Sequence, residues 1–248
     1  MERDPCLPVI IAMLMVVFSG VSMPRHGDNM KYIFKQNGDS LDFVGDFESL
    51  YKNDNDPWGQ SGKNGEMSHY YAHSRKRLIE QLKKIKPKSL LETGCGLGYA
   101  TKNIQESLPE CNVIGVDISK TAIVKAAKLF PNLNFETADI RNANIDLNLK
   151  YDVIILNQLL WYVLEFFSET LENCFSLLNP EGKIIISQAF LKTPQKYGTD
   201  ICDGFDGLIE YLTINNFDIE YYNLDNSNSY VHNDGLVIFK KQDGERSK

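Results

Sequence analysis

The sequence predicts an α/β fold built on a doubly wound, mostly parallel sheet of seven strands. Short apolar runs alternate with helical segments along most of the chain, and this alternation is typical of parallel strands joined by helices. In addition, Leu90–Gly98 and Val113–Asp117 frame one βαβ unit with glycines at its first turn. We therefore expect a ligand at the carboxyl ends of the strands.

The chain ahead of this unit predicts two helical pieces. Residues 38–65 are rich in Asp, Asn and Gly and are interpreted as a mobile entry segment with a short helical piece at Phe43–Tyr51. Met67–Lys84 has helical apolar spacing, and Pro87 ends that helix before the first strand. A helix therefore leads directly into the sheet.

Strands and helices are expected in turn beyond the βαβ unit. Ser119 is placed to cap a helix at Lys120–Leu129. The remaining expected elements are a third strand ending in Phe135–Ile140, a fourth at Tyr151–Gln158, an amphipathic helix at Val163–Leu178, a fifth strand ending at Ser187, a last helix at Gly207–Asn216 and a closing antiparallel pair at Phe217–Asn223 and Tyr230–Lys240.

The spacing of the glycines discriminates between candidate ligands. Gly94, Gly96 and Gly98 alternate directly after Glu92, and Tyr99 stands where a dinucleotide fold needs Gly or Ala. A carboxylate just ahead of the turn opposes the anion binding that a helix N-terminus otherwise favours. The pattern therefore disfavours a pyrophosphate and is compatible with a cationic or zwitterionic ligand.

These motifs, in this order, make the chain resemble the class I S-adenosylmethionine-dependent methyltransferases from about Asp56 to about Lys240. The resemblance implies a Rossmann-like sheet and S-adenosyl-L-methionine as the cofactor. It implies that the three glycines let the backbone approach the cofactor and that Glu92 lies beneath its aminoacyl end. The other cofactor-binding positions that it implies are Asp117 at both ribose hydroxyls, Asp139 at the adenine amino group, Ile118 and Ile140 on the two faces of the adenine, and Asn157 on the methyl-donor side.

A second set of residues resembles a narrower branch of that family. Asp56-Pro57-Trp58, followed by Tyr70-Tyr71 and Arg75 on a helix, is similar to small-molecule methyltransferases related to the nodulation-factor N-methyltransferase. This similarity implies that Arg75 pairs with the methionine carboxylate of the donor. It also implies that Trp58 and Tyr71 wall the sulfonium, since aromatic faces attract cations.

Catalysis requires little beyond alignment of the acceptor and exclusion of water, because the methyl donor is already activated. His69, one helical turn from His73, is the leading candidate for a general base, with a solvated or packing role as the alternative. Tyr71 and Trp161 are the other candidate catalytic residues, and Trp161 is equally compatible with core packing. His232 is interpreted as structural.

The composition limits the kinds of binding partner that we expect. A formal charge of −7 and a pI near 5.2 give no general attraction to a phosphate backbone, so nucleic acid is not expected as the acceptor. The five cysteines have neither a pairing pattern nor metal-ligand spacing, as expected for reduced thiols, and no metal cofactor is expected. The expected partner is a small-molecule methyl acceptor, and the oligomeric state stays open.

The chain divides into four expected parts: an apolar leader at 1–29, an N-terminal lid and helix at 30–86, a methyltransferase domain at 87–242 and a flexible tail at 243–248. The leader superficially resembles a signal peptide, but Glu2 and Asp4 offset Arg3 in its first residues. The alternatives are a peripheral membrane anchor through residues 7–18, a disordered leader, or a mis-assigned start ahead of Met30. We expect a cytoplasmic protein that contacts a membrane only if the leader is retained.

The leading functional hypothesis is a methyltransferase that acts on N or O of a small polar acceptor such as a sugar, an amino sugar or a secondary metabolite. Two alternatives stay open at this point. One is a nucleotide-dependent oxidoreductase on a Rossmann-like sheet, which Tyr99 argues against. The other is a non-catalytic binding protein that retains the methyltransferase fold.

Overall fold

A computed structural model describes residues 25–37, 40–62, 68–142, 149–195, 197–227 and 232–242. Most of the expected leader and the whole of the expected tail at 243–248 lie outside these residues. Across the described ranges, none of the helices combines the length and the apolar character that spanning a membrane requires.

The central sheet has the strand order β5-β4-β3-β6-β7-β9-β8. Neighbouring strands from β5 to β7 are parallel, whereas β9 is antiparallel to both β7 and β8. This confirms the predicted mostly parallel, seven-stranded sheet and its closing pair. The strands are β3 (Ser89–Thr93), β4 (Asn112–Asp117), β5 (Asn134–Thr137), β6 (Tyr151–Asn157), β7 (Leu178–Leu191), β8 (Phe217–Asp225) and β9 (His232–Lys241).

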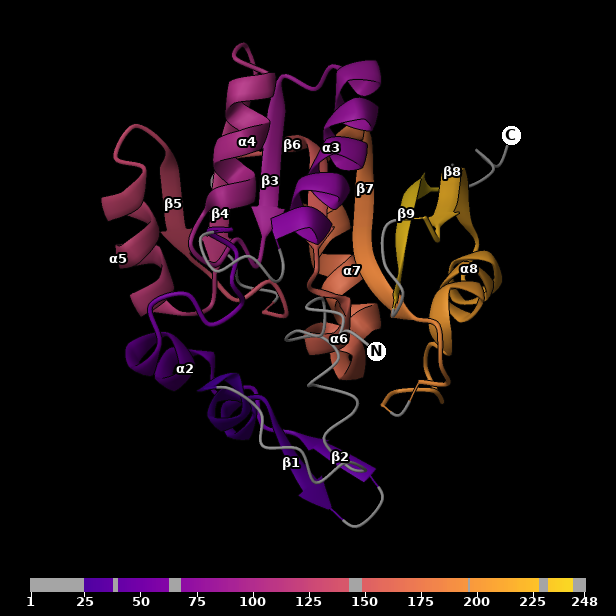
Figure 1. Cartoon of the computed structure of the whole chain (residues 1–248). Helices are drawn as coiled ribbons and strands as arrows, with labels where there is room; N and C mark the ends of the chain where they lie inside the picture. The colour runs from indigo at the N-terminus through magenta and orange to yellow at the C-terminus, as the bar shows by residue number, and fades with distance from the viewer. Residues whose placement is uncertain are drawn as a thin grey trace.

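Helices cover both faces of the sheet (Figure 1). They are α3 (Ser68–Ile85), α4 (Tyr99–Ser107), α5 (Lys120–Leu129), α6 (Leu160–Val163), α7 (Phe167–Ser176) and α8 (Gly204–Ile214). The predicted helix at Met67–Lys84 is thus confirmed as α3. The predicted cap of α5 is also confirmed, because the Ser119 hydroxyl accepts a hydrogen bond from the Ala122 N–H at 3.1 Å.

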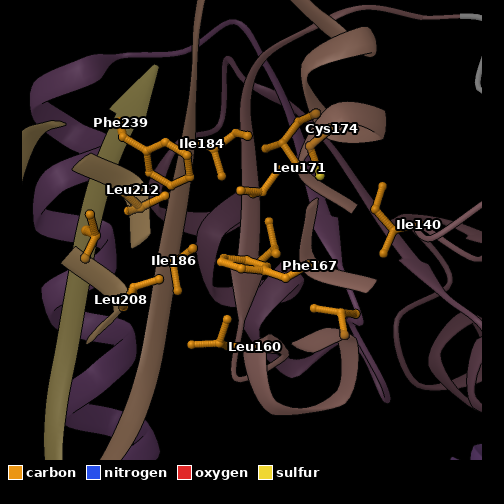
Figure 2. Packing of buried hydrophobic residues seen from close by; sticks show 14 of the residues in the cluster. Ile140, Leu160, Phe167, Leu171, Cys174, Ile184, Ile186, Leu208, Leu212 and Phe239 are labelled. Carbon is orange, nitrogen blue, oxygen red and sulfur yellow. The ribbon is translucent and has the colours of Figure 1, made fainter. Parts of the chain in front are cut away.

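Alternation along β6 divides the core into two layers. Val153 and Ile155 point to the face covered by α3 and α4, whereas Ile154 and Leu156 point to the face covered by α7 and α8. Figure 2 shows the second layer, where Phe167 and Leu171 of α7 and the leucines of α8 pack on β7 and β9. Burial of each such side chain contributes about 1.5–3 kcal/mol, so these layers fix the strand ends that carry the site.

The N-terminal segment lies at the carboxyl end of the sheet, at the bottom of Figure 1. It comprises the 3-10 helix η1 (Arg25–Tyr32), the antiparallel hairpin β1 (Phe34–Asn37) and β2 (Ser40–Phe43), α2 (Phe47–Asn53) and the turns that follow α2 up to Gly62. The sequence analysis missed the hairpin and began the helix at Phe43. The Asp46 carboxylate caps α2 by accepting the Ser49 N–H at 3.0 Å, which explains the later start. The mobility expected for residues 38–65 stays a prediction.

Hydrogen bonds join both ends of the helix α2 to α5 and to Ser119, which caps α5. At its start, the Glu48 carboxylate accepts hydrogen bonds from the Ser119 hydroxyl at 2.7 Å and from the Thr121 N–H at 3.1 Å. At its end, the Lys125 ammonium donates to the Tyr51 carbonyl at 2.5 Å. These contacts hold the N-terminal segment over the end of β4.

The structure divides the single helix predicted at Val163–Leu178. The chain forms α6, then the 3-10 turn η2 (Leu164–Phe166), and only then α7. The turn leaves Phe166 43% exposed and buries the next residue, Phe167, in the core. In addition, the last helix begins at Gly204 rather than at Gly207.

Candidate functional site

A cavity of about 930 Å³, counting its open mouth, lies at the carboxyl ends of β3, β4 and β6. The sheet side contributes Gly94, Asp117 and Asn157, and the N-terminal segment contributes Trp58 and residues of α2. This is the position that the doubly wound topology predicts for a ligand.

The glycine turn after β3 has a backbone that other residues do not adopt readily. Gly96 and Gly98 have φ of 55° and 77°. A Cβ on Gly98 would lie 2.5 Å from the Phe135 ring of β5, so this glycine serves the packing of the sheet. A Cβ on Gly96 would lie 2.6 Å from the Tyr51 hydroxyl, so this glycine makes room for the N-terminal segment. Of the three predicted glycines, only Gly94 lines the cavity directly.

Asp117 ends β4 at the cavity wall, as predicted, and its side chain is almost fully buried. Its carboxylate accepts the backbone N–H groups of Gly96 and Ser119, each at 2.9 Å. Burial raises the pKa of Asp117 to about 6. Because an ionised carboxylate has about four acceptor positions, two remain for hydroxyl groups of a ligand.

The residues predicted to surround an adenine meet on one side of the cavity. Ile118 and Ile140 both line it, the first 40% exposed and the second buried. Asp139 also lines it, but its oxygens accept Nε and Nη2 of Arg141 at 2.9 and 2.8 Å. Although burial alone would raise the pKa of Asp139, the hydrogen bonds from Arg141 lower it below its ordinary value. The Asp139 carboxylate is therefore ionised and forms an ion pair with Arg141, a residue that sequence reasoning missed.

Glu92 lies beneath the turn and is not among the residues that line the cavity, so its expected place beneath the aminoacyl end of the donor stays a prediction. Its buried carboxylate accepts the Thr101 hydroxyl at 2.5 Å and the Asn157 amide at 3.2 Å. Burial raises the pKa of Glu92. Its action on the cavity is indirect, because Asn157, which it holds, is a lining residue.

The Asp56-Pro57-Trp58 segment forms a turn closed by its own aspartate. The Asp56 carboxylate accepts the N–H groups of Gln60 at 2.8 Å and Ser61 at 3.0 Å. Arg75 donates to the backbone carbonyl of Gln60 at 3.2 Å and is not among the residues that line the cavity. Its expected pairing with a ligand carboxylate stays a prediction. Trp58 lines the cavity, and its expected contact with a sulfonium stays a prediction.

The structure brings together two of the three predicted catalytic residues. Tyr71 lines the cavity, donates to the Trp58 carbonyl at 3.2 Å, and has its pKa raised by burial. Trp161 also lines it, with the indole N–H donating to the Ala189 carbonyl at 3.1 Å. Trp161 therefore packs in the hydrophobic core and also forms part of the cavity wall. His69 is exposed and is not among the residues that line the cavity, so its role as a general base stays a prediction.

The other two histidines of interest are engaged elsewhere. His73 Nε2 lies 2.8 Å from the Asp225 carboxylate on β8. His232 is buried in β9, as its structural interpretation predicts, and burial lowers its pKa to about 4.

Sequence reasoning missed the amides and further aromatics of the cavity. These residues are Phe47, Tyr51, Gln60, Gln158, Tyr162 and Gln188. Glutamine has no motif of its own, so no signal marked the three amides. Phe47 and Tyr51 carry a weak signal, because both fall in the apolar part of the entry segment.

Gln158 is held in a left-handed conformation, with φ of 56°, directly after β6. Its amide donates to the Tyr70 hydroxyl at 2.7 Å, and this hydroxyl donates to the buried Asp234 carboxylate at 3.2 Å. Asp234 in turn pairs with Arg77 of α3 at 2.5 Å. A buried polar network therefore fixes one wall of the cavity.

A family model described as "Methyltransferase domain" matches residues 85–228, which is more than half of the chain. Among curated proteins, a putative methyltransferase 235L of Invertebrate iridescent virus 6 is 35% identical over 82 residues, which are 33% of this chain and 30% of that protein. A trans-aconitate 2-methyltransferase of Escherichia coli is 29% identical over 121 residues, 48% of this chain and 47% of that protein. The chain spans about a third to a half of the length of these relatives.

Solved structures share the fold at low sequence identity. An N-methyltransferase NodS from Bradyrhizobium japonicum WM9, in complex with S-adenosyl-L-homocysteine, matches with a TM-score of 0.57 and 16% identity over 78% of this chain and 97% of that chain. DesVI of Streptomyces venezuelae matches with a TM-score of 0.52 and 14% identity over 72% of this chain and 94% of that chain. These likenesses establish the fold.

Proposed function

Because the chain belongs to the class I S-adenosylmethionine-dependent methyltransferase family, we propose that it transfers the methyl group of S-adenosyl-L-methionine to N or O of a small polar acceptor. A sugar, an amino sugar or a secondary metabolite are the acceptor classes that we propose. NodS and the glycopeptide N-methyltransferase MtfA, which shares the fold with a TM-score of 0.53 and 12% identity, are N-methyltransferases, and an amine is therefore among the acceptor groups that we propose. A cytoplasmic location is part of the proposal, since the donor is a cytosolic metabolite.

The observation that carries this proposal is the buried carboxylate of Asp117 in the cavity wall. It lies beside a left-handed glycine turn and retains two acceptor positions for the hydroxyls of a ribose. Ile118 and Ile140 flank the space where an adenine would lie. The chemistry of these groups fits a nucleoside without a phosphate.

The remaining cavity wall supports a small, uncharged or cationic acceptor. It is made of aromatic rings, chiefly Trp58, Trp161 and Tyr162, together with the amides of Gln158 and Gln188. Rings attract positive charge, and amides offer hydrogen bonds without a net charge. When bound, S-adenosylmethionine supplies an activated methyl group, so these residues need only orient the acceptor and exclude water.

Calorimetry with S-adenosyl-L-homocysteine and the full chain tests the proposal. We expect binding by the wild type and at least a tenfold loss in Asp117→Ala. Asp152→Ala is the matched control, because this carboxylate also accepts two backbone N–H groups, those of Lys88 and Ser89, at the opposite end of the sheet. Binding that is unchanged in Asp117→Ala, or absent in the wild type, would refute the assignment. Transfer of a labelled methyl group to amino sugars and hydroxylated metabolites then identifies the acceptor.

A further inference from the structure

We propose that Tyr51 and Gln60 bind the zwitterionic amino-acid end of the methyl donor. Gln60 accepts from its ammonium, and Tyr51 donates to its carboxylate. This inference rests on the proposed function and deepens it. Both residues precede the part of the chain that the family model matches.

Both side chains meet above the middle glycine of the turn. A Cβ on Gly96 would lie 2.6 Å from the Tyr51 hydroxyl and 3.1 Å from the Gln60 side-chain carbonyl. Tyr51 and Gln60 also line the cavity. A donor and an acceptor therefore converge on the turn, against a glycine where any side chain would clash with both of them.

The side-chain oxygen of Gln60, Oε1, is buried and has no hydrogen-bond partner within the described residues. Such an acceptor is costly to bury unless something donates to it. An ammonium is the strongest donor available on a small zwitterion, because the hydrogen bond is then assisted by charge. The unsatisfied oxygen thus has the chemistry of a ligand contact.

The Tyr51 hydroxyl has the complementary capacity. Its oxygen accepts the Trp58 indole N–H at 3.0 Å, so its own proton is directed elsewhere. In the part of the chain that the structure describes, no acceptor for that proton is found. Burial raises the pKa of Tyr51 well above its ordinary value, so the hydroxyl stays a donor at neutral pH.

Other residues hold both side chains in place without touching the ligand space. Asp56 and Arg75 fix the backbone of Gln60 from two sides. Lys125 fixes the backbone of Tyr51. This arrangement reassigns the motif residues Asp56 and Arg75 as positioning residues. Glu92, which the family resemblance places at the ammonium, is already committed to its own partners.

The test compares two ligands that differ only at the amino-acid end. S-adenosyl-L-homocysteine has this end, whereas 5′-methylthioadenosine has the same adenosine and thioether without it. We expect Gln60→Leu and Tyr51→Phe each to weaken binding of the first ligand about tenfold and to leave binding of the second within twofold of the wild type. Gln81→Leu on α3, whose side-chain oxygen accepts a hydrogen bond from the Lys84 ammonium at 3.3 Å, is the control and should change neither.

A conservative replacement checks the direction of the Gln60 contact. Gln60→Glu retains an acceptor and should bind S-adenosyl-L-homocysteine at least as well as the wild type, even if Gln60→Leu folds poorly. Equal loss of both ligands in the variants, or no loss of either, would overturn the inference while the proposed function stands. If the wild type binds neither ligand, the proposed function fails and the inference fails with it.

Discussion

The Glu48 carboxylate on α2 accepts the Ser119 hydroxyl at 2.7 Å, two residues after Asp117. Ser119 also caps α5, so one hydroxyl joins the N-terminal segment to the helix that follows Asp117. The hydrogen bonds from Ser119 and Thr121 lower the pKa of Glu48 from 4.5 to about 2. The contact therefore depends on an ionised carboxylate.

We expect Glu48→Gln to destabilise the protein by less than about 1 kcal/mol at neutral pH, because the carboxylate is partly exposed and screened. The sign of the pH dependence follows from the lowered pKa. The contribution is complete above pH 4.5 and is lost as the pH falls through about 2. Urea denaturation of both proteins between pH 2 and 7 measures the difference, and a constant gap over that range would contradict the assignment.

We expect binding of S-adenosyl-L-homocysteine to strengthen as the pH rises through about 6, the raised pKa of Asp117. In the free protein, ionisation of this buried acid costs stability as the pH rises from 3.8 to about 6. A ligand that donates two hydroxyls stabilises the ionised form, so affinity should fall by up to about tenfold per pH unit below the transition. Binding titrations from pH 5 to 8 test this prediction. The Asp117→Asn variant should bind S-adenosyl-L-homocysteine weakly, with an affinity that does not change with pH over this range.

Gly98→Ala should destabilise the fold more than Gly204→Ala. Both glycines have positive φ, 77° and 69°, so both substitutions incur a left-handed backbone cost of roughly 1–2 kcal/mol. Only the first adds a clash, since a Cβ there meets the Phe135 ring at 2.5 Å, whereas nothing lies within 4 Å of the second. We expect Gly98→Ala to lower the free energy of unfolding, measured by chemical denaturation, by about 1–3 kcal/mol more than Gly204→Ala does. Equal losses would show that the ring moves aside freely.

Arg77→Met should destabilise the protein by roughly 3–5 kcal/mol, because it leaves the buried Asp234 carboxylate without its cation. Adding Asp234→Leu should recover most of that loss, since an apolar pair removes the uncompensated charge. Chemical denaturation of the single and double variants forms the test. A double variant as unstable as the sum of its parts would show that the two residues do not act as a pair.

The fold was predictable from sequence because its signals are local. The apolar run of β6 and the Ser119 cap depend on neighbouring residues, and both elements are confirmed. The hairpin β1–β2 was not predictable in the same way. Its strands are four residues long, and Lys35, Gln36 and Asn37 give one of them an exposed polar character.

The site was only partly predictable, for a different reason. Asp117 carries a motif and lies where that motif implies. Glu92 and Arg75 carry motifs as well, but their partners are protein atoms that no pattern in the sequence names. Gln60 has no pattern at all. The role that we propose for Gln60 follows from its buried side-chain oxygen, which lacks a hydrogen-bond partner among the described residues. Such a feature can be recognised only in the folded structure.

The N-terminal segment supplies much of the cavity wall, yet residues 40–62 precede the matched region at 85–228. Under the proposed function, the residues that recognise the nucleoside and those that enclose the acceptor therefore come from separate stretches of the chain. We then expect changes within residues 40–62 to alter selectivity for the acceptor while the nucleoside site is preserved. Homologues that share the glycine turn would accordingly be distinguished by comparing the stretch equivalent to residues 40–62.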